Sequence, residues 1–256
     1  MTLALPRAAA LASRLEVLEE AGSTNSELVA RAADGWPDRS VLLTDRQTAG
    51  RGRLGRSWVA PPGTSLAVSV LVRPALPLER YGWLSLLAGA AMTAAVRSLG
   101  GDADLKWPND VLIRGRKVCG VLAEALPDGS GAVLGTGLNH RIPAEALPVP
   151  TATSLLVEGL PTDPDAAVAA YLEALWALLD AFVAADGDPG SSGLRASVEA
   201  VCGTIGSRVR VQLPDGRDLV GSATGLDGDG RLLVAGGPDA APLAVAAGDV
   251  THLRYQ

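Results

Sequence analysis

Apolar positions in the first 200 residues form two kinds of pattern. Short apolar runs between turn residues predict strands at 15–20, 41–44, 66–72, 105–113, 117–125 and 132–138. Longer stretches with helical spacing predict helices at 24–33, 79–99 and 194–201, and a long one from residue 163. Positions 168, 172, 175, 179 and 182 mark the buried face of that long helix. Thr24 and Glu27 fit a capping box at the start of the first helix.

The last fifty residues follow a different pattern. Val209, Val211 and Leu213 alternate with polar residues, and turn sequences stand at 214–216 and 227–230. Short strands joined by tight turns predict a small β-barrel. We therefore divide the chain into a larger first domain, residues 1–203, and a C-terminal barrel, residues 204–256, and assign the α+β class.

Composition narrows the function classes. The 256 residues include 48% apolar and 20% charged residues, which is typical of a soluble protein. A net charge of −6 disfavours broad nucleic-acid binding. The longest nearly apolar stretch, 83–96, is too short to cross a bilayer, and early acidic residues disfavour a signal peptide. Two cysteines and two histidines predict neither a disulfide framework nor a zinc site. We expect a cytoplasmic protein without membrane or nucleic-acid partners.

Lysine is rare in this chain. Arginine occurs 20 times, whereas the two lysines, Lys106 and Lys117, lie in one segment. Chance placement is one interpretation. The other is that a compact ammonium is required there, because a guanidinium fork is larger and planar.

A loop rich in glycine and arginine follows the strand at 41–44. Gly50-Arg51-Gly52-Arg53-Leu54-Gly55 matches the dinucleotide-binding pattern G-x-G-x-x-G. That pattern requires a helix directly after the glycines, and Pro61-Pro62-Gly63 blocks one. We therefore reject a dinucleotide-binding fold.

The same loop suits an anionic ligand. Arg51, Arg53 and Arg56 lie among flexible glycines and could close over a phosphate or carboxylate, with Trp58 as a packing anchor. A solvated surface loop and a nucleic-acid contact loop are the alternatives.

The lysine segment predicts a second cluster. Lys106-Trp107-Pro108-Asn109-Asp110 precedes Lys117, and a hairpin through 114–116 would bring these groups together. Cations stabilise the charge that develops when two anions are joined. A nearby carboxylate can orient an amine or accept its proton. An ordinary turn role for Asp110 is the alternative.

These motifs together resemble the biotin protein ligase family. The resemblance covers residues 20–140, and the C-terminal barrel also fits. It is carried by Ser23-Thr24-Asn25, by the run from Gln47 to Trp58, by Lys106-Trp107-Pro108-Asn109-Asp110, by Lys117 and by Gly135-Thr136-Gly137-Leu138-Asn139.

The resemblance implies a fold and an activity. The catalytic domain would be related to class II aminoacyl-tRNA synthetases, with a mixed sheet, and an SH3-like barrel would follow it. Biotin would react with Mg-ATP to give biotinyl-5′-AMP and pyrophosphate. Biotin would then pass to one lysine of a biotin carboxyl carrier domain. Biotin and ATP are thus substrates, accompanied by Mg²⁺.

The resemblance also implies residue roles. The biotin site would comprise Ser23, Thr24, Asn25, Gln47, Arg51, Gly52, Arg53 and Lys117. The ATP and adenylate site would comprise Arg51, Arg53, Arg56, Trp58, Lys106, Asn109, Asn139 and Arg254. Lys117, Arg53 and Asp110 would be catalytic, with Asp110 facing the acceptor lysine. No residue is assigned to a metal.

Some features depart from the family. Many members carry an N-terminal DNA-binding module, and few residues precede Ser23 here, so we expect no repressor function. His140 stands where an apolar residue is usual and is expected to be solvated or capping rather than catalytic. Alternation places Cys119 on the same strand face as Lys117, although a small core residue is the simpler interpretation.

Two alternative functions remain. A lipoate ligase or octanoyltransferase resembles this fold and also modifies carrier lysines, but the complete loop and pentapeptide favour biotin. An RNA-binding module would combine the basic loop with the barrel. Nine aromatic residues and the negative net charge disfavour it, because single strands are usually held by stacking.

Overall fold

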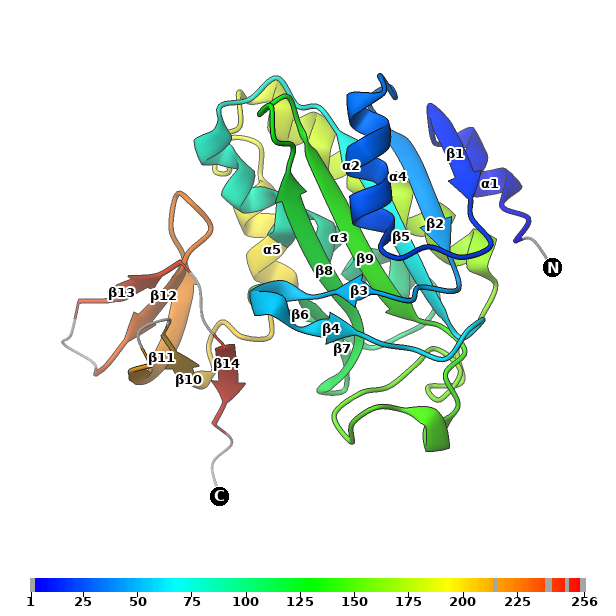
Figure 1. Cartoon of the computed structure of the whole chain (residues 1–256). Helices are drawn as coiled ribbons and strands as arrows, with labels where there is room; N and C mark the ends of the chain where they lie inside the picture. The colour runs from blue at the N-terminus through cyan, green and yellow to red at the C-terminus, as the bar shows by residue number, and fades with distance from the viewer. Residues whose placement is uncertain (1–2, 214–215, 238–240, 247–248, 254–256) are drawn as a thin grey trace.

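A seven-stranded mixed sheet forms the centre of the molecule (Figure 1). The computed structural model describes residues 3–213, 216–237, 241–246 and 249–253. In spatial order the strands are β1 (Arg14–Val17), β2 (Ser40–Thr44), β5 (Ser65–Val72), β9 (Ala132–Asn139), β8 (Arg116–Ala125), β7 (Asp110–Ile113) and β6 (Ala103–Lys106). β1 pairs with β2 in parallel, and the other neighbours are antiparallel.

The central strands are buried on both faces. β5 is buried at all eight positions, as a continuous run of apolar and small residues predicts. Alternate residues of β5 pack into two different hydrophobic cores, one on each face of the sheet. Val68 and Val70 pack on the side of α3 (Leu84–Ser98) and α4 (Pro164–Ala184), whereas Leu71 packs with Leu28 of α2 (Thr24–Ala33).

Helices cover one face of the sheet fully and the other face in part. α3 and α4 lie behind the sheet in Figure 1, together with α1 (Pro6–Ala10) and α5 (Leu194–Val201). α2 covers β2, β5 and β9 on the opposite face. The short strands β3 (Gly50–Arg51) and β4 (Ser57–Trp58) cross the rest of that face in front of β8 and β9. The cavity described below lies under this hairpin.

The C-terminal part forms a second, antiparallel sheet. Its order is β13 (Leu243–Val245), β12 (Leu232–Ala235), β11 (Asp218–Leu226), β10 (Arg208–Gln212) and β14 (Asp249–His252). Val209 and Val211 are buried and their neighbours on β10 are exposed, as the alternation predicts. Two indole N–H groups of the first domain bind the turn between β11 and β12: Trp83 donates to Gly228 O (2.8 Å) and Trp107 to Gly230 O (3.1 Å).

The structure differs from the sequence predictions at three points. The strand predicted at 105–113 is a hairpin of β6 and β7, because a turn at Trp107–Asn109 contains Pro108, which lacks an N–H for strand pairing. The loop at 45–63 contains β3, β4 and a short 3-10 turn (Arg53–Gly55). The helix predicted at 79–99 begins as a 3-10 turn, Leu78–Trp83, and a third such turn covers Ala144–Ala146.

The predicted capping box at Thr24 is wrong. Ser23 is the N-cap residue of α2, and no side chain caps this end. The backbone N–H and hydroxyl of Thr24 instead donate to Gln47 Oε1, at 2.9 and 3.2 Å. The side chain of Gln47, a predicted site residue, therefore binds the N-terminus of α2 in place of a capping side chain.

One helix is long and apolar enough to cross a membrane by length and composition. It is α4, a longer candidate than the stretch at 83–96, and half of its apolar window is buried inside the structure. Leu172, Leu175 and Leu179 belong to the core shared with α3. A core helix of a soluble domain meets the same criteria, so α4 is weak support for a membrane span.

Candidate active site

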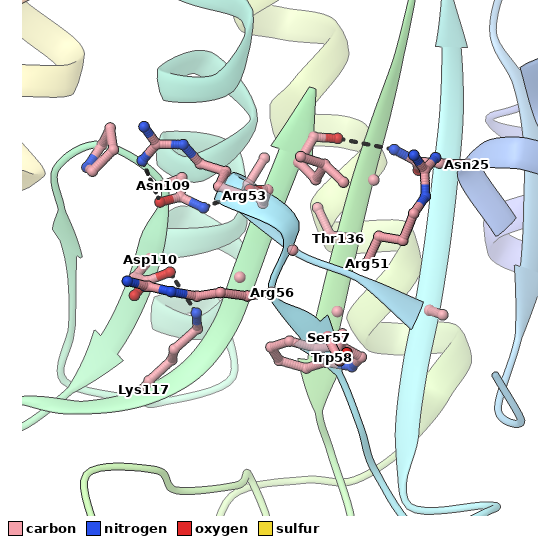
Figure 2. A pocket seen from close by; sticks show the side chains of 18 of the residues that line it. Asn25, Arg51, Arg53, Arg56, Ser57, Trp58, Asn109, Asp110, Lys117 and Thr136 are labelled. Atoms are coloured by element: carbon pink, nitrogen blue, oxygen red, sulfur yellow. Dashed lines mark hydrogen bonds and ion pairs between the residues drawn. The ribbon is translucent and has the colours of Figure 1, made fainter. Parts of the chain in front are cut away.

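A cavity of about 360 Å³ lies between the N-terminus of α2, the β3–β4 hairpin, the sheet and the β6–β7 turn (Figure 2). The residues predicted for the site that line it are Ser23, Thr24, Asn25, Gln47, Arg51, Gly52, Arg53, Arg56, Trp58, Lys106, Asn109, Asp110 and Lys117. Ala67, Trp107, Gly120, Gly135, Thr136 and Gly137 also line it, as do Val250 and Thr251 of β14. Segments distant in the sequence therefore meet in one site.

One end of the cavity is neutral and polar. Gln47 accepts both hydrogen bonds from Thr24, and Ser69 Oγ lies 2.8 Å from Thr24 Oγ1 and 2.6 Å from Asn25 Oδ1. Thr24, Asn25 and Ser69 are buried. Uncharged amides and hydroxyls suit a neutral ligand group that both donates and accepts hydrogen bonds.

The other end is cationic. Four basic side chains line it, Arg53, Arg56, Lys106 and Lys117, together with one carboxylate, Asp110. Lys117 Nζ lies 2.6 Å from Asp110 Oδ1, and Figure 2 shows the two side chains pointing toward each other from β8 and β7. Arg53 donates to Asn109 Oδ1 (3.2 Å), whose amide donates to Val121 O (2.7 Å). Such a surface favours carboxylate and phosphate groups.

Glycines form the floor between these ends. Gly120 and Gly137 are register partners on β8 and β9, and the Trp58 ring lies against both. A Cβ at position 137 would come within 2.5 Å of the Trp58 indole, and one at position 135 would overlap Asn25. Glycine is required here by close approach of side chains. Gly135 and Gly137 belong to a motif that carries the family resemblance, but the sequence analysis assigned them no role in the site.

Glu124 is a site residue that the sequence analysis missed. Its Oε2 accepts from Asn25 Nδ2 (2.8 Å) and from Arg51 NH2 (2.9 Å). Arg51 also donates to Ser26 Oγ (3.0 Å). Glu124 therefore joins the neutral end of the cavity to the glycine-arginine loop.

The strand-face prediction for Cys119 is wrong. Val111 pairs with Cys119 and Leu112 with Lys117, so Val118 is an extra residue, a β-bulge. The bulge shifts the alternation, and the Lys117 ammonium faces the Gly120 position instead. Cys119 is fully buried, and this burial raises the pKa of its thiol to about 12. It is a core residue.

The expectation of a solvated or capping His140 is also wrong. The residue is 1% exposed, and neither ring nitrogen has a hydrogen-bond partner among the described residues. Burial, helped by the charge of Arg141 and opposed by Thr162, Asp45 and Gly63, lowers the pKa of the imidazole to about 4. The imidazole is therefore neutral near pH 7.

One residue assigned to the adenylate lies outside the cavity lining. Asn139 is buried outside the cavity lining, and its Nδ2 donates to Thr153 O (3.0 Å). Arg254 lies outside the described residues. Their roles stay predictions.

The sequence and structure match known protein ligases. The Biotin/lipoate A/B protein ligase family profile matches residues 22–139, and the Biotin protein ligase C terminal domain profile matches residues 204–253. Fold and site thus define a protein ligase of the biotin and lipoate class. The chain is 43% identical over 249 residues to the biotin–[acetyl-CoA-carboxylase] ligase of Mycobacterium tuberculosis, covering 94% of this chain and 90% of that protein. Within the class, the chain belongs to the biotin protein ligase family.

Other relatives agree with this assignment. The bifunctional ligase/repressor BirA of Escherichia coli is 30% identical, over 85% of this chain and 68% of that protein. The biotin protein ligase of Aquifex aeolicus in complex with biotin and ATP superposes with a TM-score of 0.75 at 25% identity, covering 94% of this chain and 100% of that chain. The predicted mixed sheet and small C-terminal β domain are confirmed. The family assignment also decides for an enzyme over an RNA-binding module.

Replacement of Gly137 by alanine tests the floor of the cavity. The added methyl group would displace the Trp58 ring, so we expect Gly137→Ala to lower the free energy of unfolding by about 1–3 kcal/mol. In a Trp58→Ala background the same change should cost much less, because the clash is gone. Denaturant unfolding of the four proteins measures both values. Equal costs in the two backgrounds would contradict the contact.

The buried imidazole predicts a pH dependence of stability. Between the unfolded pKa of 6.5 and the folded value of about 4, the unfolded state binds more protons. Stability therefore falls as the pH drops through this window, and His140 contributes no slope above it. The loss should reach up to about 3 kcal/mol. His140→Leu should show a shallower fall in denaturant unfolding from pH 7 to 4, and parallel curves would refute the assignment.

Proposed function

We propose that this chain activates biotin with Mg-ATP and transfers it to a lysine of a biotin carboxyl carrier domain. The observation that carries the proposal is a single cavity with a neutral hydrogen-bonding end and a cationic end, in a chain of the biotin protein ligase family. The ureido ring of biotin is neutral and both donates and accepts, whereas its carboxylate and the phosphates of ATP are anions.

Biotin binds with its ring at the neutral end. Ser23, Thr24, Asn25 and Gln47 surround the ring, and Ala67 of β5 offers an apolar contact to the tail. Arg51 and Gly52 come from the loop that covers this end. Ser69 and Glu124 hold Asn25 in place, since both bind its side-chain amide.

Activation takes place at the cationic end. A biotin carboxylate oxygen attacks the α-phosphorus of ATP, a new O–P bond forms, and the bond to the β-phosphate breaks to release pyrophosphate. Lys117 and Arg53 stabilise the charge that develops at phosphorus. Arg56, Trp58, Lys106 and Asn109 border the space for the nucleotide, with Asn139 and Arg254 as further assigned contacts. Mg²⁺ enters with the ATP phosphates.

Transfer follows at the carboxyl carbon of the activated biotin. The amine of the acceptor lysine attacks the mixed anhydride, an amide bond forms, and AMP leaves. The amine must lose a proton, and the Asp110 carboxylate is placed beside Lys117 to receive it. The acceptor is a biotin carboxyl carrier domain of a carboxylase.

Several wider features belong to the same proposal. The catalytic domain covers residues 1–203 and the SH3-like β domain covers residues 204–256. The protein is cytoplasmic and acts without a membrane. The net charge of −6 supports the absence of nucleic-acid binding.

The activity is tested on a purified carrier domain. Incubation with this protein, biotin and Mg-ATP should add one biotin to one lysine, detected by mass spectrometry, with release of pyrophosphate. Lipoate and octanoate in place of biotin are the matched comparison. Labelling by either acid in preference to biotin would replace the proposal with the alternative ligase or transferase.

The Lys117→Ala variant should keep the fold and lose adenylate formation. Removing a preorganised charge beside the reacting anions typically costs about 10²–10³ in rate. Lys117→Arg should be nearly as poor, because a planar fork does not occupy the place of an ammonium. Pyrophosphate release measures the rate, and thermal unfolding checks the fold. A folded Lys117→Ala protein with near wild-type release would exclude this role.

A further inference from the structure

Lys117 lies where the sheet is interrupted. β9 pairs with β8 from Ala125 as far as Cys119, and the bulge at Val118 follows. Beyond it, the segment 151–153 takes the place of β9 along β8. Lys117 N donates to Thr151 O (2.7 Å), and Thr153 N donates to Lys117 O (2.8 Å). This segment therefore fixes both backbone groups of Lys117.

Thr153 is the anchor of that segment. The residue is fully buried. Asn139 Nδ2 donates to its carbonyl oxygen (3.0 Å), and its hydroxyl donates to Glu158 Oε1 (2.6 Å). A buried threonine with both groups bound has little freedom to shift.

Glu158 connects Thr153 to strand β8. Its side chain is 3% exposed, and Oε1 also accepts from Arg116 NH2 at 2.6 Å. Arg114 NH1 lies 3.6 Å from Oε2. Arg116 directly precedes Lys117, so one buried carboxylate ties the strand before Lys117 to the segment that grips its backbone. Glu158 is not among the residues that line the cavity.

We propose that Glu158 is a positioning residue for Lys117, acting through Thr153 and Arg116. This inference rests on the proposed role of Lys117 in adenylation. The Lys117 side chain reaches Asp110 from the position next to the bulge at Val118, where the regular alternation of the strand is shifted. The buried network sets the direction of the side chain instead. A shift of about 1 Å in a positioned group can cost about 100-fold in rate.

The test compares one Glu158 variant and a pair of Thr153 variants by steady-state pyrophosphate release. Glu158→Gln keeps the shape and removes the charge that holds both arginines. Thr153→Val removes the hydroxyl at nearly constant volume, and Thr153→Ser restores it. We expect kcat to fall about 10- to 100-fold in Glu158→Gln and Thr153→Val, with the KM for biotin within about threefold of wild type. Thr153→Ser should recover most of kcat.

A buried carboxylate elsewhere supplies the control. The side chain of Asp165 is 8% exposed and accepts hydrogen bonds from the backbone N–H groups of Arg7 and Ala8. None of these three residues lines the cavity. Asp165→Asn should lower the melting temperature without changing kcat. Loss of kcat in Asp165→Asn equal to that in Glu158→Gln would show a general effect of lost stability and overturn the proposal.

A double-variant cycle with Lys117→Ala identifies the route of the effect. Because Glu158 acts through Lys117, adding Glu158→Gln to Lys117→Ala should lower kcat by less than about twofold further. A full additional 10- to 100-fold loss would overturn the positioning role. An unchanged kcat in Glu158→Gln and Thr153→Val would also overturn it, provided that the wild-type protein is active and Lys117→Ala is inactive. A wild-type protein that releases no pyrophosphate would instead refute the proposed function. If Glu158→Gln does not fold, the Thr153 pair decides.

Discussion

The cavity depends on the absence of side chains at three positions on two neighbouring strands. Gly120, Gly135 and Gly137 leave the middle of the sheet bare on the face that α2 covers only in part. Trp58 can therefore lie flat on the sheet, and Asn25 can reach β9. An alanine at either β9 position would meet these side chains rather than solvent. The glycines give the enzyme a ligand site where a sheet would otherwise have a second apolar layer.

The distribution of charge then divides the cavity into a neutral end and a cationic end. The Lys117–Asp110 pair places the ammonium at the cationic end before any ligand arrives. An anionic ligand competes with Asp110 for that ammonium, since both carry negative charge. In the proposed mechanism the ligand takes over the ammonium, and the Asp110 carboxylate then serves as the base for the acceptor amine. Mobile arginines suit the covering loop, whereas the fixed position on β8 takes the compact cation.

Apolar periodicity predicted most elements, and local motifs identified site residues that, apart from Asn139 and Arg254, all line the cavity. Predictions failed where tertiary contacts override a local rule. The bulge at Val118 reversed the face of Cys119, Gln47 replaced the cap at Thr24, and burial excluded solvent from His140. Glu158 carries no local signal at all, since its partners come from β8 and from the segment it follows.

The second domain contributes to the site by binding the turn within the Lys106–Asp110 segment. Trp107 lies between Lys106 and Asp110, and its indole donates to Gly230 O in the turn between β11 and β12. The backbone N–H of Trp107 also donates to the hydroxyl of Thr204. That hydroxyl lies 3.1 Å from Nε2 of His252, the last residue of β14. Two other residues of β14, Val250 and Thr251, line the cavity. The turn is thus held at Thr204, where the β domain begins, and at Gly230 in the turn between β11 and β12. A shift of that domain would move Lys106 and Asp110 together, so its position is part of the geometry of the cationic end.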